Sequence, residues 1–94
     1  MLEDRKKRVL QAIVEEYIQT AEPVSSNAIM NFEGLECSSA TIRNEMAELE
    51  KMGYIEKTHT SSGRVPSAKG YRYYVDELLE DNKITVHLLE GLDV

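Results

Sequence analysis

The stretch that decides the fold is residues 38–66, SSATIRNEMAELEKMGYIEKTHTSSGRVP. It begins with a serine pair that can cap a helix, and apolar residues then recur at helical spacing. Gly53 ends that pattern, and residues 54–58 and 64–65 read as two short strands around a polar loop. We therefore expect a helix over about residues 39–52, followed by a β-hairpin.

The face of this helix opposite its apolar stripe carries small residues, an arginine and an asparagine. Ala40 and Ala47 would let the helix backbone approach another molecule closely. Arg43 and Asn44 carry side chains that pair with guanine and adenine edges in the major groove. A helix of this kind beside a β-hairpin is typical of a winged helix-turn-helix, with the helix in the major groove. The alternative for the arginine is an ion pair with a glutamate later in the same helix.

The hairpin loop is rich in hydroxyl groups and ends in a Gly-Arg pair. Gly63 would allow a positive φ in a tight turn, and Arg64 is expected to enter a minor groove or contact a phosphate. Thr60, Ser61 and Ser62 are either phosphate donors or ordinary turn residues. The alternative is a solvated hairpin with an incidental arginine.

Further DNA contacts are expected at the start of the helix and among nearby lysines. Hydroxyls and unpaired N–H groups at a helix N-terminus favour phosphate, although the same serines can simply cap the helix. The basic run at residues 5–8 is more readily explained as a solvated helix face. The full set of expected contacts is Ser38, Ser39, Ala40, Thr41, Arg43, Asn44, Ala47, Lys51, Thr60, Ser61, Ser62, Gly63, Arg64 and Lys69.

The sequence before this stretch predicts two helices. The first spans about residues 4–20 with Asp4 as N-cap, and the second spans about 26–32 with Ser25 or Ser26 as cap. Their expected core-facing residues are Leu10, Ile13, Val14, Tyr17 and Ile18 in the first helix, and Ala28, Ile29 and Phe32 in the second. The short connection that follows suits a helix-turn-helix.

After the hairpin, Ser67 is expected to cap a last helix that packs on the core or on a partner subunit. Its apolar residues recur at helical spacing at Tyr71, Tyr74, Val75, Leu78 and Leu79. We therefore assign residues 1–80 to a mainly α winged helix-turn-helix DNA-binding domain with a small β-hairpin. Residues 81–94 read as an acidic tail, or as the start of a following region with a strand near 84–88.

The charge of the chain bears on this reading. Ninety-four residues, 41% of them apolar, make one small domain, and its net charge of −6 argues at first against DNA. Residues 76–94 hold six acids and one base, whereas residues 1–75 hold eleven acids and ten bases. Local potential matters more than total charge, so we expect modest affinity from one domain and reliance on a dimer.

Other classes of function find little support in the sequence. Cys37 is the single cysteine and cannot form an internal disulfide, which favours a reducing, cytosolic compartment. His59 and His87 lack neighbouring metal ligands, and no nucleotide-binding or zinc-protease motif occurs. No run of about 18 apolar residues is present. We therefore expect no metal, no cofactor, no catalytic activity and no membrane partner.

Three blocks of the sequence together resemble the N-terminal domain of the heat-inducible transcription repressor family, HrcA. They are TAEPVSS at 20–26, SSATIRNEM at 38–46 and HTSSGRVPSAKGYRYYV at 59–75, within a resemblance over about residues 5–79. The resemblance implies a homodimer that represses heat-shock and chaperone genes by binding an inverted-repeat operator in the bacterial cytoplasm, at the nucleoid. It also implies partnership with the chaperonin GroEL, and a C-terminal dimerisation region that this chain lacks.

Two departures from the family pattern lie near the expected second helix. Ser25 stands where the family tends to have glycine, and no basic residue accompanies Asn27, so the positive charge that would favour a phosphate contact from that segment is missing. The chain reads as a fragment, or as a short relative with a different sensor. Alternative functions are a winged helix that binds proteins through its acidic surface, and a repressor of another regulon. A small enzyme or single-strand binder is a weaker third.

Overall fold

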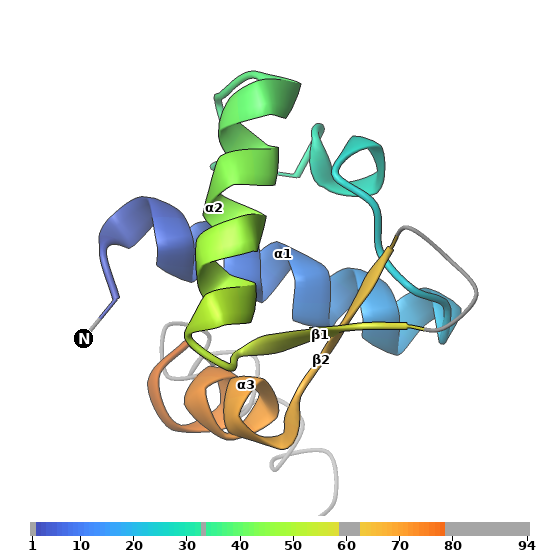
Figure 1. Cartoon of the computed structure of the whole chain (residues 1–94), viewed down its shortest axis with the longest axis vertical. Helices are drawn as coiled ribbons and strands as arrows, with labels where there is room; N and C mark the ends of the chain where they lie inside the picture. The colour runs from blue at the N-terminus through green and yellow to red at the C-terminus, as the bar shows by residue number, and fades with distance from the viewer. Residues whose placement is uncertain (1, 33, 59–62, 79–94) are drawn as a thin grey trace, which may run out of the picture.

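The computed structural model describes residues 2–32, 34–58 and 63–78 and has the predicted helix and hairpin content (Figure 1). The elements are α1 (Asp4–Thr20), the 3-10 turn η1 (Asn27–Ile29), α2 (Ser39–Lys51), β1 (Ile55–Lys57), β2 (Arg64–Pro66), α3 (Ala68–Tyr73) and the π-helical turn η2 (Tyr74–Leu78). The prediction of a mainly α winged helix-turn-helix with a small β-hairpin is confirmed.

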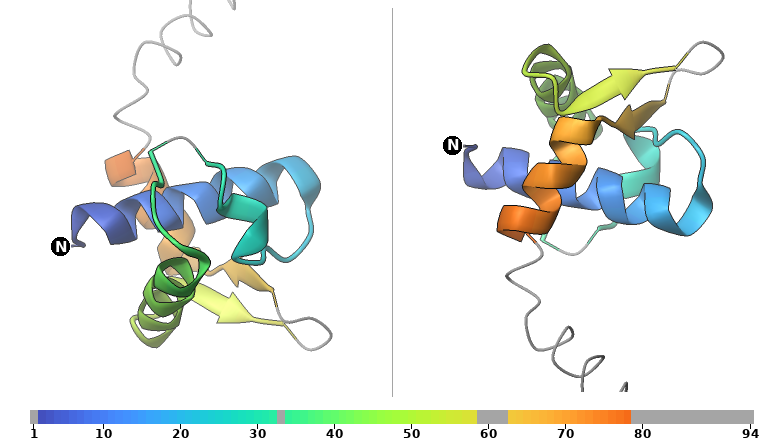
Figure 2. Two further views of the ribbon diagram at one scale, coloured as in Figure 1. Left: turned by 90° about the horizontal axis from the view of Figure 1, so that it is seen from above. Right: turned by 90° about the horizontal axis from the view of Figure 1, so that it is seen from below.

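Helix α1 is the element on which the others pack. Val9, Leu10, Ala12, Ile13 and Val14 are fully buried along it. The buried face of α2 adds Ile42, Met46 and Leu49, and the core is completed by Leu2, Val24, Ile29, Leu35, Ile55, Tyr74 and Leu78. Figure 2 shows α2 and the hairpin on the same side of α1, while α3 crosses α1 next to the hairpin.

The hairpin gains a third, very short partner. Its two strands pair antiparallel with Ile55 opposite Pro66 and Lys57 opposite Arg64. Val24, in the connection after α1, forms an isolated bridge with Arg64 through backbone N–O distances of 2.8 and 2.9 Å. The sequence did not predict this bridge, which fixes β2 against the segment that leads into η1.

Helix boundaries follow the predicted capping chemistry at two positions. Ser38 Oγ accepts a hydrogen bond from the Thr41 N–H at 3.2 Å, and Ser67 Oγ accepts one from the Gly70 N–H at 3.0 Å. Gly53 has φ +87 just beyond α2, so a left-handed residue ends that helix where the sequence predicted. Side-chain caps satisfy N–H groups that a helix leaves unpaired.

The predicted cap of α1 and the predicted second helix are wrong. The N-cap of α1 is Glu3, without a side-chain cap bond, and not Asp4. The helix expected over 26–32 is only the 3-10 turn η1, with Ala28 exposed, although Ser25 Oγ does accept from the Ala28 N–H at 3.2 Å. So short a segment cannot complete a cooperative α-helix, and tertiary contacts of its buried isoleucine hold it instead.

Besides Ala28, two apolar residues of the predicted helix stripes are exposed. Ile18, in the last turn of α1, is 59% exposed, and Val75 in η2 is 54% exposed. Helical spacing predicts the direction of a side chain but not whether a neighbouring element reaches it. The predictions for Leu79, for residues 81–94 and for His59 and His87 lie outside the described residues.

Candidate nucleic-acid interface

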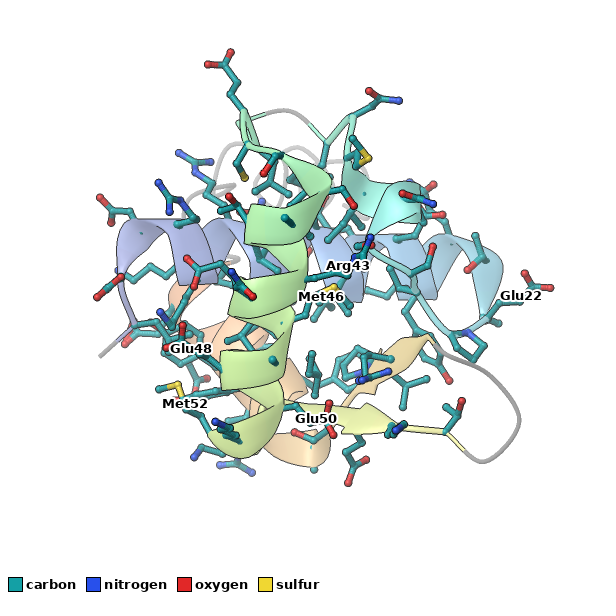
Figure 3. The ribbon with its side chains drawn as sticks, turned by 45° about the horizontal axis from the view of Figure 1, so that its top comes forward. Glu22, Arg43, Met46, Glu48, Glu50 and Met52 are labelled. Carbon is teal, nitrogen blue, oxygen red and sulfur yellow. The ribbon has the colours of Figure 1, made fainter. Side chains whose placement is uncertain are left out.

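The face of α2 that points away from the core is open to solvent (Figure 3). The five residues predicted to form its contact face are all exposed, namely Ala40, Arg43, Asn44, Ala47 and Lys51. The opposite face is packed, with Ile42 and Leu49 fully buried. Among the residues that the structure describes, Arg43 has no ion pair, so the glutamate partner considered for it is not present.

The polar side chains at the start of α2 differ in whether they bond within the helix terminus. Ser38 Oγ holds the Thr41 N–H and also lies 3.0 Å from Thr41 Oγ1, so its hydroxyl is used within the helix terminus. Ser39 and Thr41 are half-buried. The N–H groups of the first turn point outward along the helix axis and carry its partial positive charge, which favours an anion there.

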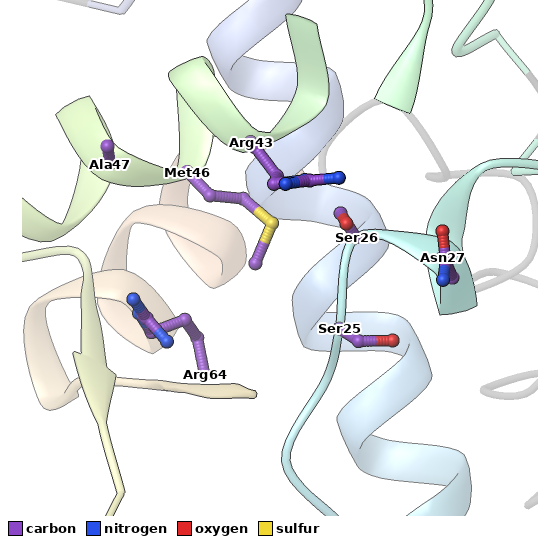
Figure 4. A pocket seen from close by; sticks show the side chains of 7 residues that line it. All are labelled: Ser25, Ser26, Asn27, Arg43, Met46, Ala47 and Arg64. Atoms are coloured by element: carbon purple, nitrogen blue, oxygen red, sulfur yellow. The ribbon is translucent and has the colours of Figure 1, made fainter. Parts of the chain in front are cut away.

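A groove of about 370 Å³ lies between α2, β2 and the segment before η1 (Figure 4). Its lining residues are Ser25, Ser26, Asn27, Arg43, Met46, Ala47 and Arg64. Figure 4 shows Arg43 and Met46 reaching from α2 into this groove. The groove therefore joins the predicted contact face of α2 to the wing strand and to three polar residues, 25–27, which sequence reasoning had set aside for lack of a positive charge.

Arg64 lies in β2 and contacts α2. Its Nε donates to Glu50 Oε1 at 2.7 Å, and its Nη1 donates to the carbonyl oxygen of Gly63 at 3.2 Å. The guanidinium thus borders the groove as part of an ion pair that links the last turn of α2 to the wing. The expected loop residues Thr60, Ser61 and Ser62 lie outside the described part of the chain.

Gly63 is needed for a reason other than the predicted one. Its φ is not in the left-handed region, unlike the values at Gly34 and Gly53. A Cβ at residue 63 would instead lie 2.8 Å from Pro23 Cβ and 3.0 Å from Val24 N. The glycine lets β2 approach the backbone of the α1–η1 connection, so the prediction of a positive φ is wrong.

Lys69 supports the end of α2. Its Nζ donates to the Met52 carbonyl oxygen at 2.8 Å and lies 4.5 Å from the centroid of the Tyr54 ring. A cation at a helix C-terminus stabilises the exposed carbonyl groups and the helix dipole. These contacts give Lys69 a structural role that does not involve DNA. The predicted DNA contact of Lys69 stays a prediction.

Lys6 is buried between α1 and α2, so the view of residues 5–8 as a solvated face is wrong at this position. Its Nζ lies 3.1 Å from Glu45 Oε1, 3.4 Å from Glu48 and 3.7 Å from Glu3. The hydrogen bond to Glu45, with the other carboxylates, raises the pKa of Lys6 above its usual value despite burial. The cluster fixes α2 across α1 and so orients its outer face.

Cys37 is a free thiol, half-buried against the core just before α2, as expected of a small apolar filler. Within residues 2–32, 34–58 and 63–78, no group of three or more His, Cys, Asp or Glu side chains is placed to hold a metal ion. In the same residues, no helix has the length and apolar character needed to cross a bilayer.

Comparison with known proteins gives a consistent result. The sequence model of the family described as winged helix-turn-helix transcription repressor, HrcA DNA-binding, matches residues 1–78. The heat-inducible transcription repressor HrcA of Desulforudis audaxviator is 63% identical over 79 residues, which are 84% of this chain and 23% of that protein. Its counterpart from Acetivibrio thermocellus is 56% identical over 85 residues, 90% of this chain and 24% of the relative.

A solved structure supports the same fold. A crystal structure of a hypothetical protein superposes with a TM-score of 0.79 at 51% identity, covering 84% of this chain and 25% of that chain. This chain therefore spans about a quarter of the length of the relatives it matches. Its likeness to them concerns one domain of longer proteins.

Proposed function

The chain belongs to the HrcA family of winged helix-turn-helix transcription repressors, and we propose that it binds operator DNA through the exposed face of α2. The observation that carries this proposal is the exposure of Arg43, Asn44 and Ala47 on α2. Helix α2 lies on the same side of α1 as the hairpin (Figure 2). One duplex can meet both elements, with α2 in the major groove and the wing on the backbone or in the minor groove.

Each exposed residue has a role in this arrangement. Arg43 donates to guanine O6 and N7, and Asn44 pairs with the N6 and N7 edge of adenine. The small side chains of Ala40 and Ala47 let the helix backbone approach the groove closely, so that Arg43 and Asn44 can both reach the bases. The N-terminal turn of α2 and Lys51 at its other end contact phosphates, which sets the register of the helix in the groove.

The relatives are named heat-inducible transcription repressors, and we propose the same role for this protein. Two copies on an inverted repeat would double a weak electrostatic contribution, because residues 1–75 hold eleven acids and only ten bases. Dimerisation, and the chaperonin partnership that the family resemblance implies, would be supplied by the parts of such a repressor outside this domain.

The test is the selection of bound sites from random duplexes at fixed salt, followed by affinity measurements on the selected site and on random DNA. Arg43→Ala is expected to cost about 1–3 kcal/mol on the selected site and to relax the choice of one base pair. Arg43→Lys is the matched control, since it keeps the charge but loses bidentate geometry. It should bind random DNA like the parent and still lose selectivity.

Two outcomes would contradict the proposal. An equal loss for Arg43→Ala on selected and random duplexes would remove this residue from base reading. Failure to enrich any sequence would favour a winged helix that binds another protein.

A further inference from the structure

A carboxylate lies at the edge of the proposed DNA-binding surface. Glu50, in the last turn of α2, accepts a hydrogen bond from Arg64 Nε at 2.7 Å across the gap between α2 and β2. The side chains of Glu50 and Arg64 are 35% and 21% exposed, so solvent and any bound duplex can reach both. Figure 3 shows Glu50 at the hairpin end of α2.

A carboxylate at this place opposes DNA binding in general. Phosphates within the Debye length, about 8 Å at physiological salt, are repelled by it. It also pairs with an arginine that would otherwise release a counterion from the duplex. The Glu50 carboxylate therefore lowers affinity for DNA, and only a separate contribution to binding would offset this loss.

The contacts of Arg64 indicate that Glu50 orients its guanidinium. A charge-assisted hydrogen bond from Nε to the Glu50 carboxylate and a second bond from Nη1 to the Gly63 carbonyl oxygen hold the planar guanidinium in one orientation. An arginine that is already ordered loses less rotamer freedom when it meets an acceptor on DNA. The backbone of Arg64 is held separately by its bridge to Val24. The ion pair with Glu50 therefore fixes the orientation of the guanidinium and not the position of the strand.

We propose that Glu50 is a positioning residue that presents Arg64 to operator DNA in a fixed orientation and withholds it from phosphates of random DNA. The inference rests on the proposed function and names a determinant of its specificity. A non-specific complex depends on phosphate contacts alone and loses one of them through this pair. In an operator complex, α2 contacts base edges, and the oriented guanidinium binds its acceptor on DNA with a smaller loss of rotamer freedom.

The main experiment compares the chain with its Glu50→Gln variant on the selected operator and on a random duplex, between about 50 and 200 mM salt. Glutamine keeps the shape and removes the charge. We expect roughly threefold tighter binding to random DNA at the lower salt, and a log–log salt slope steeper by about 0.9, the value of one phosphate. Operator affinity should stay level or fall, so the ratio of operator to random affinity drops.

Matched variants separate positioning from a general effect of charge. Glu56→Gln also neutralises an exposed acid, on β1, but among the described residues Arg64 pairs with Glu50 and not with Glu56, so the ratio of operator to random affinity should stay unchanged. In an Arg64→Ala background, most of the effect of Glu50→Gln should vanish, because its route runs through Arg64. Glu50→Asp keeps the negative charge, but its shorter side chain cannot hold the Arg64 guanidinium in the same orientation. Operator affinity should therefore fall, while the salt dependence of the affinity for random DNA stays unchanged.

Unchanged random affinity and slope in Glu50→Gln would overturn the proposal. So would a parallel rise on operator and random DNA, which would make Glu50 a repelling charge only. These results leave the proposed function intact. A parent chain that does not distinguish operator from random DNA would instead overturn the proposed function.

Discussion

Gly63→Ala tests whether close packing at the base of the wing holds the domain together. In the structure, an added Cβ would lie 2.8 Å from Pro23 Cβ, 2.9 Å from the Pro23 carbonyl carbon and 3.0 Å from Val24 N. Two of these three atoms belong to the backbone and cannot rotate away. The strand must therefore move off the α1–η1 connection.

The expected loss of stability follows from two contributions. Forcing an extra methyl group into a packed site costs about 1–3 kcal/mol. If β2 separates from Val24, the two backbone bonds of 2.8 and 2.9 Å between Val24 and Arg64 are lost as well, each contributing about 0.5–1.5 kcal/mol. Together these amount to roughly 2–6 kcal/mol, a large fraction of the 5–15 kcal/mol typical of a domain.

Urea denaturation of the 94-residue chain measures this loss, and Gly53 provides the control. Gly53 has φ +87, and an added Cβ there meets only the Lys69 side chain, at 3.8 Å. Asparagine tolerates a left-handed backbone better than alanine, so Asn should be the milder substitution at Gly53. At Gly63 the order should reverse, because a larger side chain worsens the clash.

A loss below about 0.5 kcal/mol for Gly63→Ala would refute the packing argument, because that is the range of ordinary surface substitutions. Asn milder than Ala at Gly63 would do the same and would point back to backbone conformation.

Three further predictions concern the supports of α2 and the core. Ser38→Ala should lower the free energy of unfolding by about 1 kcal/mol through loss of the N-cap, whereas Ser38→Asn should be nearly neutral; equal losses in urea would contradict capping. Lys6→Met should lower the melting temperature because Glu45 is left buried without its partner, and adding Glu45→Met should recover stability; no recovery would contradict the pairing. Burial and the Glu15 carboxylate raise the pKa of Tyr74 to about 12, above the unfolded value near 10. The unfolded chain then loses its proton first, so stability should fall between about pH 10 and 12, and Tyr74→Phe should show a shallower fall in alkaline denaturation; an unchanged profile would exclude this tyrosine.

Local chemistry accounts for the parts of the fold that the sequence predicted. The bounds of α1, the cap of α2 by Ser38, the stop at Gly53 and the cap of α3 by Ser67 each depend on residues within one or two turns. The outer face of α2 was predictable for the same reason, since helical spacing assigns directions once one face is known to be buried.

The errors share a different cause, because they depend on residues distant in sequence. Lys6 belongs to a basic run, and nothing near it indicates a buried partner 39 residues later. Gly63 was interpreted through turn conformation, whereas its neighbour in space is the Pro23 backbone. Ile18 fits the apolar stripe of α1 but lies beyond the elements that cover that stripe. A single sequence shows helical periodicity and capping residues, but it does not show which distant element packs against a given side chain.

The same long-range contacts change how the acidity of the chain bears on DNA binding. Lys6 is surrounded by three glutamates, Arg64 is paired with Glu50, and Lys69 caps α2, so each of these cations already has a partner within the protein. On α2, by contrast, Arg43 and Lys51 are exposed, with no ion pair to any described residue. Phosphate attraction is then weak for one domain, and the DNA binding that we propose would depend on base contacts and on two copies acting together. A weak non-specific background is an advantage for a repressor, because random sites greatly outnumber its operators.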